Sequence, residues 1–282
     1  MNDQAFTGSS TYVLDDELAK IVNISMVLEM PLLLKGEPGT GKTMLAHAVS
    51  ESLGMKLIVL NVKSSMKLVD ALYQYDTLTR LNDSRFGDSN RDVSDIEEYI
   101  RMGKIGQAFT ASERCVLLID EIDKADSDFQ DDMLDVLDQM QFDIIETDRV
   151  VTARTRPVII ITSNAKKDLS DPFLGRCNFH HIAFPDPEMM NSIVDAHFPH
   201  ISANLARNAI NLFYELRSIE AIEKKPATRE LINWIRALLA DPDFSEGQRL
   251  NREIPYLGVL FKKSEDYQKS LGAVQKRGFF KN

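Results

Sequence analysis

The sequence is poor in cysteine and in basic charge. Only two of its 282 residues are cysteines, Cys115 and Cys177. They do not form a C-x-x-C pair, so the sequence indicates neither a zinc site nor a dithiol redox site. The 43 acidic residues outnumber the 33 basic ones and give a net charge of −10. Because non-specific binding of DNA or RNA needs a basic surface, this charge argues against nucleic acid as a partner.

Long apolar runs are missing as well. No run approaches the roughly 20 apolar residues that a membrane-spanning helix needs. Residues 1–11 are polar and do not have the pattern of a signal peptide. We therefore expect a cytoplasmic protein with no membrane span. Its 44% of apolar and 27% of charged residues are typical of a globular protein.

A glycine-rich stretch stands out against this background. It reads Gly36-Glu37-Pro38-Gly39-Thr40-Gly41-Lys42-Thr43 and fits G-x-x-x-x-G-K-[ST]. An apolar run precedes it, and a helical pattern from Met44 follows it. Such a loop brings backbone N–H groups and a helix N-terminus to a phosphate chain. Lys42 can reach the β- and γ-phosphates, and the Thr43 hydroxyl can hold Mg²⁺. The alternative is a plain Gly/Pro turn, but this context favours nucleotide binding by residues 36–44.

A second motif consists of two acids at the end of a predicted strand. Asp120 and Glu121 follow the apolar run 115–119. Asp120 suits Mg²⁺, directly or through water, and Glu121 could orient or activate water beside the γ-phosphate. The simpler alternative is an acidic turn after a strand. Residues 120–123 lack the D-x-x-G of a GTPase, and residues 164–168 lack N-K-x-D spacing, so ATP hydrolysis is the better interpretation.

Three further polar residues are candidates for the same site. Asn164 follows the predicted strand 158–163, at the edge of a parallel sheet that faces ligands. It could position the attacking water, or it could simply form a turn. Arg176 lies between predicted strands and could equally be a surface arginine. Arg229 opens a predicted helix, where a cation is unfavourable and therefore invites a ligand explanation.

Strands alternate with helices in the first two thirds of the chain. This pattern predicts a parallel α/β sheet with crossover helices. Pro185-Asp186-Pro187 marks a boundary, beyond which the pattern is helical. We predict an α/β nucleotide-binding core over residues 1–185, and a smaller helical domain with the C-terminal segment over 186–282. Within the core, residues from about 63 to 90 are less regular, and residues from about 142 to 154 pattern as a β-hairpin.

The chain resembles the MoxR family of AAA+ ATPases. Residues 36–43, 117–125, 161–164, 173–177 and 225–230 carry the resemblance, which extends from Tyr12 to about Asp241. It implies a P-loop AAA+ core followed by an all-helical lid, with ATP and Mg²⁺ as ligands. It also implies a homo-oligomeric, typically hexameric, ring that acts with a von Willebrand factor A domain partner and remodels or activates a client protein.

The resemblance implies roles for individual residues. Asn164 would be sensor 1, and Arg229 the sensor 2 arginine of the lid. Arg176 would be an arginine finger that enters the site of a neighbouring subunit. Gly175 stands where a second arginine is common in the family, which leaves Arg176 as the sole finger candidate at this position.

The resemblance also assigns three segments. Tyr12 and Val13 resemble the segment that holds adenine. The region of about 63–90 resembles the helix-2 insert of the family, and the region of about 142–154 resembles its hairpin before sensor 1. Both elements would face a central pore.

Two alternatives to an ATP-driven chaperone remain open. The first is a nucleic-acid motor or helicase loader, which shares the ATPase motifs but fits poorly with an acidic chain that lacks a basic stripe. The second is a regulatory ATP-binding switch with little turnover. DNA-stimulated activity would favour the first, and measurable steady-state hydrolysis would exclude the second.

Overall fold

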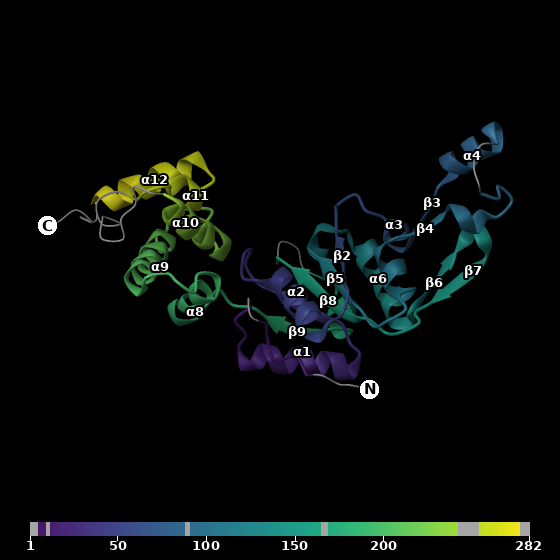
Figure 1. Cartoon of the computed structure of the whole chain (residues 1–282), viewed down its shortest axis with the longest axis horizontal. Helices are drawn as coiled ribbons and strands as arrows, with labels where there is room; N and C mark the ends of the chain where they lie inside the picture. Colours follow the sequence, from purple (N-terminus) through teal and green to yellow (C-terminus); the bar gives the residue numbers. More distant parts are fainter. Residues whose placement is uncertain (1–4, 10–11, 88–90, 165–168, 242–253, 277–282) are drawn as a thin grey trace. The chain divides into compact units, whose positions relative to one another are not determined.

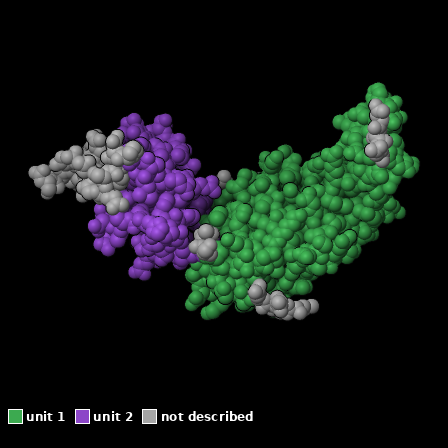
Figure 2. All heavy atoms as spheres, viewed as in Figure 1, with its two compact units in different colours: residues 1–9, 14–36, 41–182 green, residues 10–13, 37–40, 183–282 purple. Residues whose placement is uncertain are grey.

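The computed structural model describes residues 5–9, 12–87, 91–164, 169–241 and 254–276. The chain forms two compact units, shown in Figures 1 and 2. Unit 1 comprises residues 1–9, 14–36 and 41–182, and unit 2 comprises residues 10–13, 37–40 and 183–282. Two short segments, 10–13 and 37–40, therefore belong by their contacts to unit 2, although the chain on both sides of them belongs to unit 1.

Unit 1 is built around a five-stranded parallel sheet. Its strand order is β2-β5-β8-β1-β9. Every side chain of β8 is buried, and most of those of β1 and β5 are too. Continuous burial of this kind is typical of parallel strands that helices cover on both faces. The predicted α/β sheet is confirmed, with strands β1 (Leu32–Lys35), β2 (Leu57–Asn61), β5 (Val116–Asp120), β8 (Val158–Ser163) and β9 (Asn178–His181).

Helices flank this sheet. Helix α1 packs against β1 and β9, α2 against β2, β5 and β8, and α5 against β2 and β5. Short polar residues fix several helix starts: the Asp15 carboxylate accepts the Leu18 N–H at 2.6 Å and caps α1. The helices of unit 1 are α1 (Asp16–Leu28), α2 (Lys42–Leu53), α3 (Leu68–Leu72), α4 (Thr77–Phe86), α5 (Lys104–Phe109), α6 (Ser127–Gln139) and α7 (Asp171–Gly175), with 3-10 turns η1 (Ile96–Tyr99), η2 (Ile122–Lys124) and η3 (Ile145–Thr147).

The strand order brings three motifs to one edge of the sheet. Strand β8 lies between β5 and β1, pairing Ile161 with Ile119 on one side and Thr162 with Leu34 on the other. Since these strands are parallel, their carboxyl ends share an edge. The glycine-rich loop follows β1, the acid pair ends β5, and Asn164 follows β8. This is the edge at which parallel α/β sheets bind their ligands.

Two small antiparallel sheets extend unit 1. The first pairs β3 with β4, and α4 and η1 lie between these strands in the chain. Thus the stretch from about 63 to 90 is more regular than its sequence suggests, although residues 88–90 lie outside the described residues. The second is a hairpin of β6 and β7 around η3. These strands are β3 (Tyr73–Tyr75), β4 (Ile100–Met102), β6 (Gln141–Ile144) and β7 (Arg149–Thr152).

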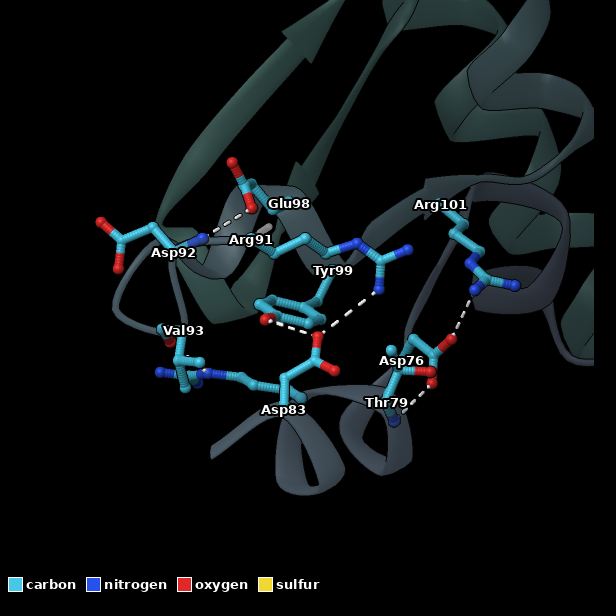
Figure 3. A network of polar contacts seen from close by, with 10 residues as sticks. Asp76, Thr79, Asp83, Arg91, Asp92, Val93, Glu98, Tyr99 and Arg101 are labelled. Carbon is cyan, nitrogen blue, oxygen red and sulfur yellow. Dashed lines mark hydrogen bonds and ion pairs between the residues drawn. The ribbon is translucent and has the colours of Figure 1, made fainter. Parts of the chain in front are cut away.

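Helix α4 is held to unit 1 by polar contacts, because none of its side chains is buried. The Asp83 carboxylate accepts the Tyr99 hydroxyl at 3.0 Å and lies 3.6 Å from Nη1 of Arg91 (Figure 3). The Arg80 guanidinium donates to the Tyr75 hydroxyl at 2.7 Å. Exposed apolar side chains on the helix are Leu78, Leu81 and Phe86.

Unit 2 is helical in its described part. Its apolar core surrounds Trp234, whose ring is fully buried and whose indole N–H donates to the Pro255 carbonyl at 2.7 Å. Among the residues that the structure describes, no helix is both long and apolar enough to span a membrane. The helices of unit 2 are α8 (Pro187–His197), α9 (Ala203–Arg217), α10 (Thr228–Ala240), α11 (Leu257–Leu260) and α12 (Ser264–Lys276).

The polar attachment of α4 can be tested by replacing Asp83 with alanine. Asp83→Ala removes the acceptor for both Tyr99 and Arg91, so amide hydrogen exchange within residues 77–86 should speed up about fivefold. The melting temperature of the protein should stay near that of the parent, because the exposed helix contributes little to the core. The control is Asn82→Ala, an exposed position on the same helix. Equal exchange in the two variants would show that Asp83 does not hold α4.

Candidate functional site

The glycine-rich loop has a backbone suited to binding phosphate. Gly39 and Gly41 have φ angles of +83° and +94°, which favour glycine over other residues. Within unit 2, a side chain at Gly39 would place its Cβ 2.4 Å from the Cβ of Ala227, so the close approach also requires glycine. Gly41 is the residue immediately before α2. The first N–H groups of a helix have no acceptor within the helix itself, and those of α2 can therefore serve an anion in the loop.

Lys42 opens α2 and is folded into the loop. Its side chain is buried, and its Nζ donates to the Gly36 carbonyl at 2.9 Å. An ammonium has three protons and can donate in several directions. The ammonium of Lys42 therefore lies next to the backbone of the loop, where the motif predicts that phosphate binds. Met44, the last residue of the predicted loop site, is 47% exposed on α2.

The two residues predicted to hold Mg²⁺ lie in contact. The Thr43 hydroxyl donates to Oδ1 of Asp120 at 2.9 Å, across 77 positions of sequence. Both offer hard oxygen atoms, and Mg²⁺ in phosphate-binding sites takes only one or two protein oxygens and keeps water and phosphate for the rest. Among the described residues, no three His, Cys, Asp or Glu side chains form a fuller metal cage. The donor set therefore fits Mg²⁺ bound together with a phosphate chain.

Glu121 is held next to this pair in an uncommon conformation. Its φ of +60° is left-handed, which costs a residue other than glycine on the order of 1–2 kcal/mol. Asn164 Nδ2 donates to Oε1 of Glu121 at 2.9 Å, and Lys124 forms an ion pair with Oε2. The hydrogen bond with Glu121 is the main reason that the pKa of the Lys124 ammonium is raised. Both oxygens of the carboxylate are thus engaged by neighbouring donors.

Asn164 is oriented from two sides. Its side chain contacts Glu121, and its backbone N–H donates to Oδ1 of Asp123 at 3.2 Å. Asp123 is 2% exposed and Asn164 is half-buried, so this bond is partly shielded from water. A turn-forming asparagine would not need the contact with Glu121. The geometry therefore favours the interpretation in which Asn164 serves the site.

Two members of this cluster were not singled out from the sequence. Thr162 precedes Asn164 by two residues in β8, and its hydroxyl donates to Oδ1 of Asp120 at 2.6 Å. Lys124 stands three residues after Glu121, and the 3-10 turn η2 brings such a pair to one side. A hydroxyl near the end of a buried strand was the available signal for Thr162. The spacing of three residues after Glu121 was the available signal for Lys124.

Arg176 lies outside this cluster. It follows α7 and pairs with α6 of its own chain: its Nε is 2.6 Å from Oδ2 of Asp138, and its Nη2 is 3.9 Å from Oδ1 of Asp135. The side chain is 41% exposed. A residue that serves a neighbouring subunit is expected at the surface rather than in its own site, and its finger role stays a prediction.

The remaining candidates belong to unit 2. Tyr12 and Val13 are half-buried there, in the same unit as loop residues 37–40. Arg229, the second residue of α10, is exposed and makes no hydrogen bond or ion pair with any described residue. Within this unit, Arg217 Nη2 is 3.1 Å from Oε2 of Glu37. The roles predicted for Tyr12, Val13 and Arg229 stay predictions.

Comparison with known proteins gives a consistent result. Residues 32–185 match the family described as "ATPase family associated with various cellular activities (AAA)". The chain is 30% identical over 160 residues to the Lon protease of Mycoplasma mobile, covering 51% of this chain and 16% of that protein. It is 26% identical over 138 residues to the 26S proteasome subunit RPT4 of Saccharomyces cerevisiae, covering 45% and 26% respectively. The chain therefore spans only a minor part of either relative.

Lys42→Ala is expected to weaken nucleotide binding by roughly 10- to 100-fold, because it removes the charge-assisted hydrogen bonds of the loop's ammonium. Isothermal calorimetry with ATP and Mg²⁺ measures this affinity directly. Lys56→Ala, at an exposed lysine before β2, is the matched control and should bind like the parent. Near-normal ATP affinity in folded Lys42→Ala protein would show that this loop is not the nucleotide site.

Proposed function

The chain belongs to the AAA family of ATPases, and from that premise we propose that it hydrolyses ATP to remodel or activate a client protein. The observation that carries the proposal is the arrangement of Glu121, Asn164, Asp120 and Thr43 at one edge of the sheet. It combines a carboxylate able to orient or activate water with a pair of oxygens able to hold Mg²⁺. A site that only bound nucleotide would have no need for a carboxylate that acts on water.

Each group has a part in this reaction. Backbone N–H groups of the loop and the Lys42 ammonium bind the triphosphate, and Thr43 and Asp120 hold Mg²⁺. When bound, Mg²⁺ neutralises charge that develops on the phosphate oxygens. Glu121 accepts a hydrogen bond from the attacking water and orients it toward the γ-phosphate. Asn164 keeps the carboxylate in place for this task.

The finer proposal is a ring of MoxR type, with residues 186–282 as a lid that carries Arg229 and with Tyr12 and Val13 at the adenine. A von Willebrand factor A domain protein would be the partner. One relative is a protease and the other a subunit of the 26S proteasome, which supports a protein as the client. The exposure of Arg176 supports a role at a neighbouring subunit.

The elements proposed to face the pore are coupled to each other. Arg149 of β7 pairs at 2.8 Å with Glu97 of η1, which follows the insert in the chain. The backbone N–H of Ile145, at the hairpin tip, donates to the Tyr73 hydroxyl of β3 at 3.1 Å. A displacement of the hairpin is therefore passed to the insert, which supports a joint role of the two in moving a client.

Glu121→Gln should separate binding from hydrolysis. The amide is nearly isosteric with the carboxylate but cannot act as a base, so the turnover number should fall by about 10²–10⁴-fold while ATP still binds. Phosphate release and calorimetry measure the two quantities. Glu113→Gln, at an exposed residue before β5, should leave both unchanged. Hydrolysis at the parental rate by Glu121→Gln would remove Glu121 from the mechanism, and absence of steady-state turnover in the parent would favour a switch.

Arg176→Ala should leave ATP binding intact and lower hydrolysis by on the order of 10³-fold, as expected for loss of an arginine finger. Asp138→Asn is the matched control, since it breaks the same ion pair but keeps the guanidinium, and it should retain hydrolysis. Mixing Arg176→Ala with Lys42→Ala subunits should restore part of the phosphate release, because each supplies what the other lacks. A strictly monomeric active parent, or no recovery despite subunit exchange, would contradict action in trans.

A further inference from the structure

We propose that Thr162 is the positioning residue that fixes Glu121 relative to Asp120. The inference rests on the proposed function, because it concerns the carboxylate that handles water and the carboxylate that holds Mg²⁺. Thr162 lies in the central strand β8 and is 1% exposed. Its hydroxyl is hydrogen-bonded to both acidic residues.

One hydroxyl makes two directed hydrogen bonds here. Thr162 Oγ1 donates its proton to Oδ1 of Asp120 at 2.6 Å and accepts the backbone N–H of Glu121 at 2.9 Å. The first bond has the short length that is typical of a hydroxyl donating to a carboxylate. A hydroxyl has a single proton, so donation to Asp120 leaves its lone pairs for the N–H of Glu121. The two contacts therefore orient each other.

The second bond replaces a bond of the sheet. The last pair of the β5–β8 ladder joins Ile119 to Ile161, and the chain leaves the sheet after Asp120. A backbone N–H at such a point needs a partner. By accepting the N–H of Glu121, Thr162 lets the backbone turn into its left-handed conformation at φ +60° while that group stays paired. This turn directs the Glu121 side chain toward Asn164.

The first bond fixes the other carboxylate. Oδ1 of Asp120 accepts hydroxyls from both Thr43 and Thr162, one from α2 and one from β8. Two donors from different elements leave the carboxylate little freedom to rotate. Thr162 is thus shared between the metal-holding residue and the water-handling residue. A change at Thr162 alters their relative position, and small misplacements of reacting groups cost a large part of the rate.

The test compares two substitutions at this position. Thr162→Val keeps the shape of the side chain but removes both hydrogen bonds, and we expect kcat to fall about 10- to 100-fold with KM within about threefold of the parent. Thr162→Ser restores the hydroxyl and should recover most of kcat. Calorimetry should find an ATP affinity within about threefold of the parent in both, since neither substitution touches the loop. Thr162→Ala, which deletes the hydroxyl without the valine methyl, should reproduce the loss of kcat.

A double substitution distinguishes positioning from a general structural effect. If Thr162 acts through Glu121, adding Thr162→Val to Glu121→Gln should lower kcat no further, whereas independent effects would multiply. Parental kcat in Thr162→Val, with Glu121→Gln inactive, would overturn this inference alone. Multiplicative losses would also overturn it. Parental kcat in Glu121→Gln would overturn the proposed role of Glu121 and this inference together.

Discussion

The hydrogen bond between Thr43 and Asp120 is the constraint on which the site depends. It joins the end of the glycine-rich loop to the end of β5, although β8 separates β5 from β1 in the sheet. The intervening strand β8 is tied in as well, because the hydroxyl of its Thr162 donates to the same oxygen of Asp120. Three adjacent elements are therefore held together through a single carboxylate. A shift of any one of them would displace the loop from the acids. The register of the sheet therefore determines how Thr43, Asp120 and Thr162 lie relative to one another.

Electrostatics explains the donors that surround this carboxylate. Three acids, Asp120, Glu121 and Asp123, lie within four positions, and like charges this close repel unless donors or cations balance them. Asn164 donates its backbone N–H to the buried Asp123 and its side-chain amide to Glu121. Lys124 forms an ion pair with the other oxygen of Glu121. In the proposed function, Mg²⁺ adds the positive charge that the phosphates also require. These donors thus hold the acids in the arrangement that the proposed hydrolysis needs.

The sequence predicted the parts of this protein that are local in the chain. The loop, the acid pair and the alternation of strands and helices are contiguous patterns, and the parallel sheet that they predicted is confirmed. Thr162 and Lys124 could not be found in this way, because their partners are set by strand register and by the turn η2. Helix α4 was missed for another reason: it is held by Asp83 and Arg80 rather than by an apolar face, so it lacks the period that marks a buried helix.

The surface ion pair of Arg176 with Asp138 would hinder the proposed finger role of Arg176 very little. Both Arg176 and its partner Asp138 are more than two-fifths exposed, and pairs of this kind contribute only about 0–1 kcal/mol because water competes for each charge. Breaking the pair is therefore inexpensive compared with what a guanidinium gains at the charged oxygens of a transferring phosphoryl group. The acids of α6 keep the side chain ordered without trapping it. In the proposed ring, the approach of a neighbour's nucleotide would thus be sufficient to draw Arg176 from Asp138 into the adjoining site.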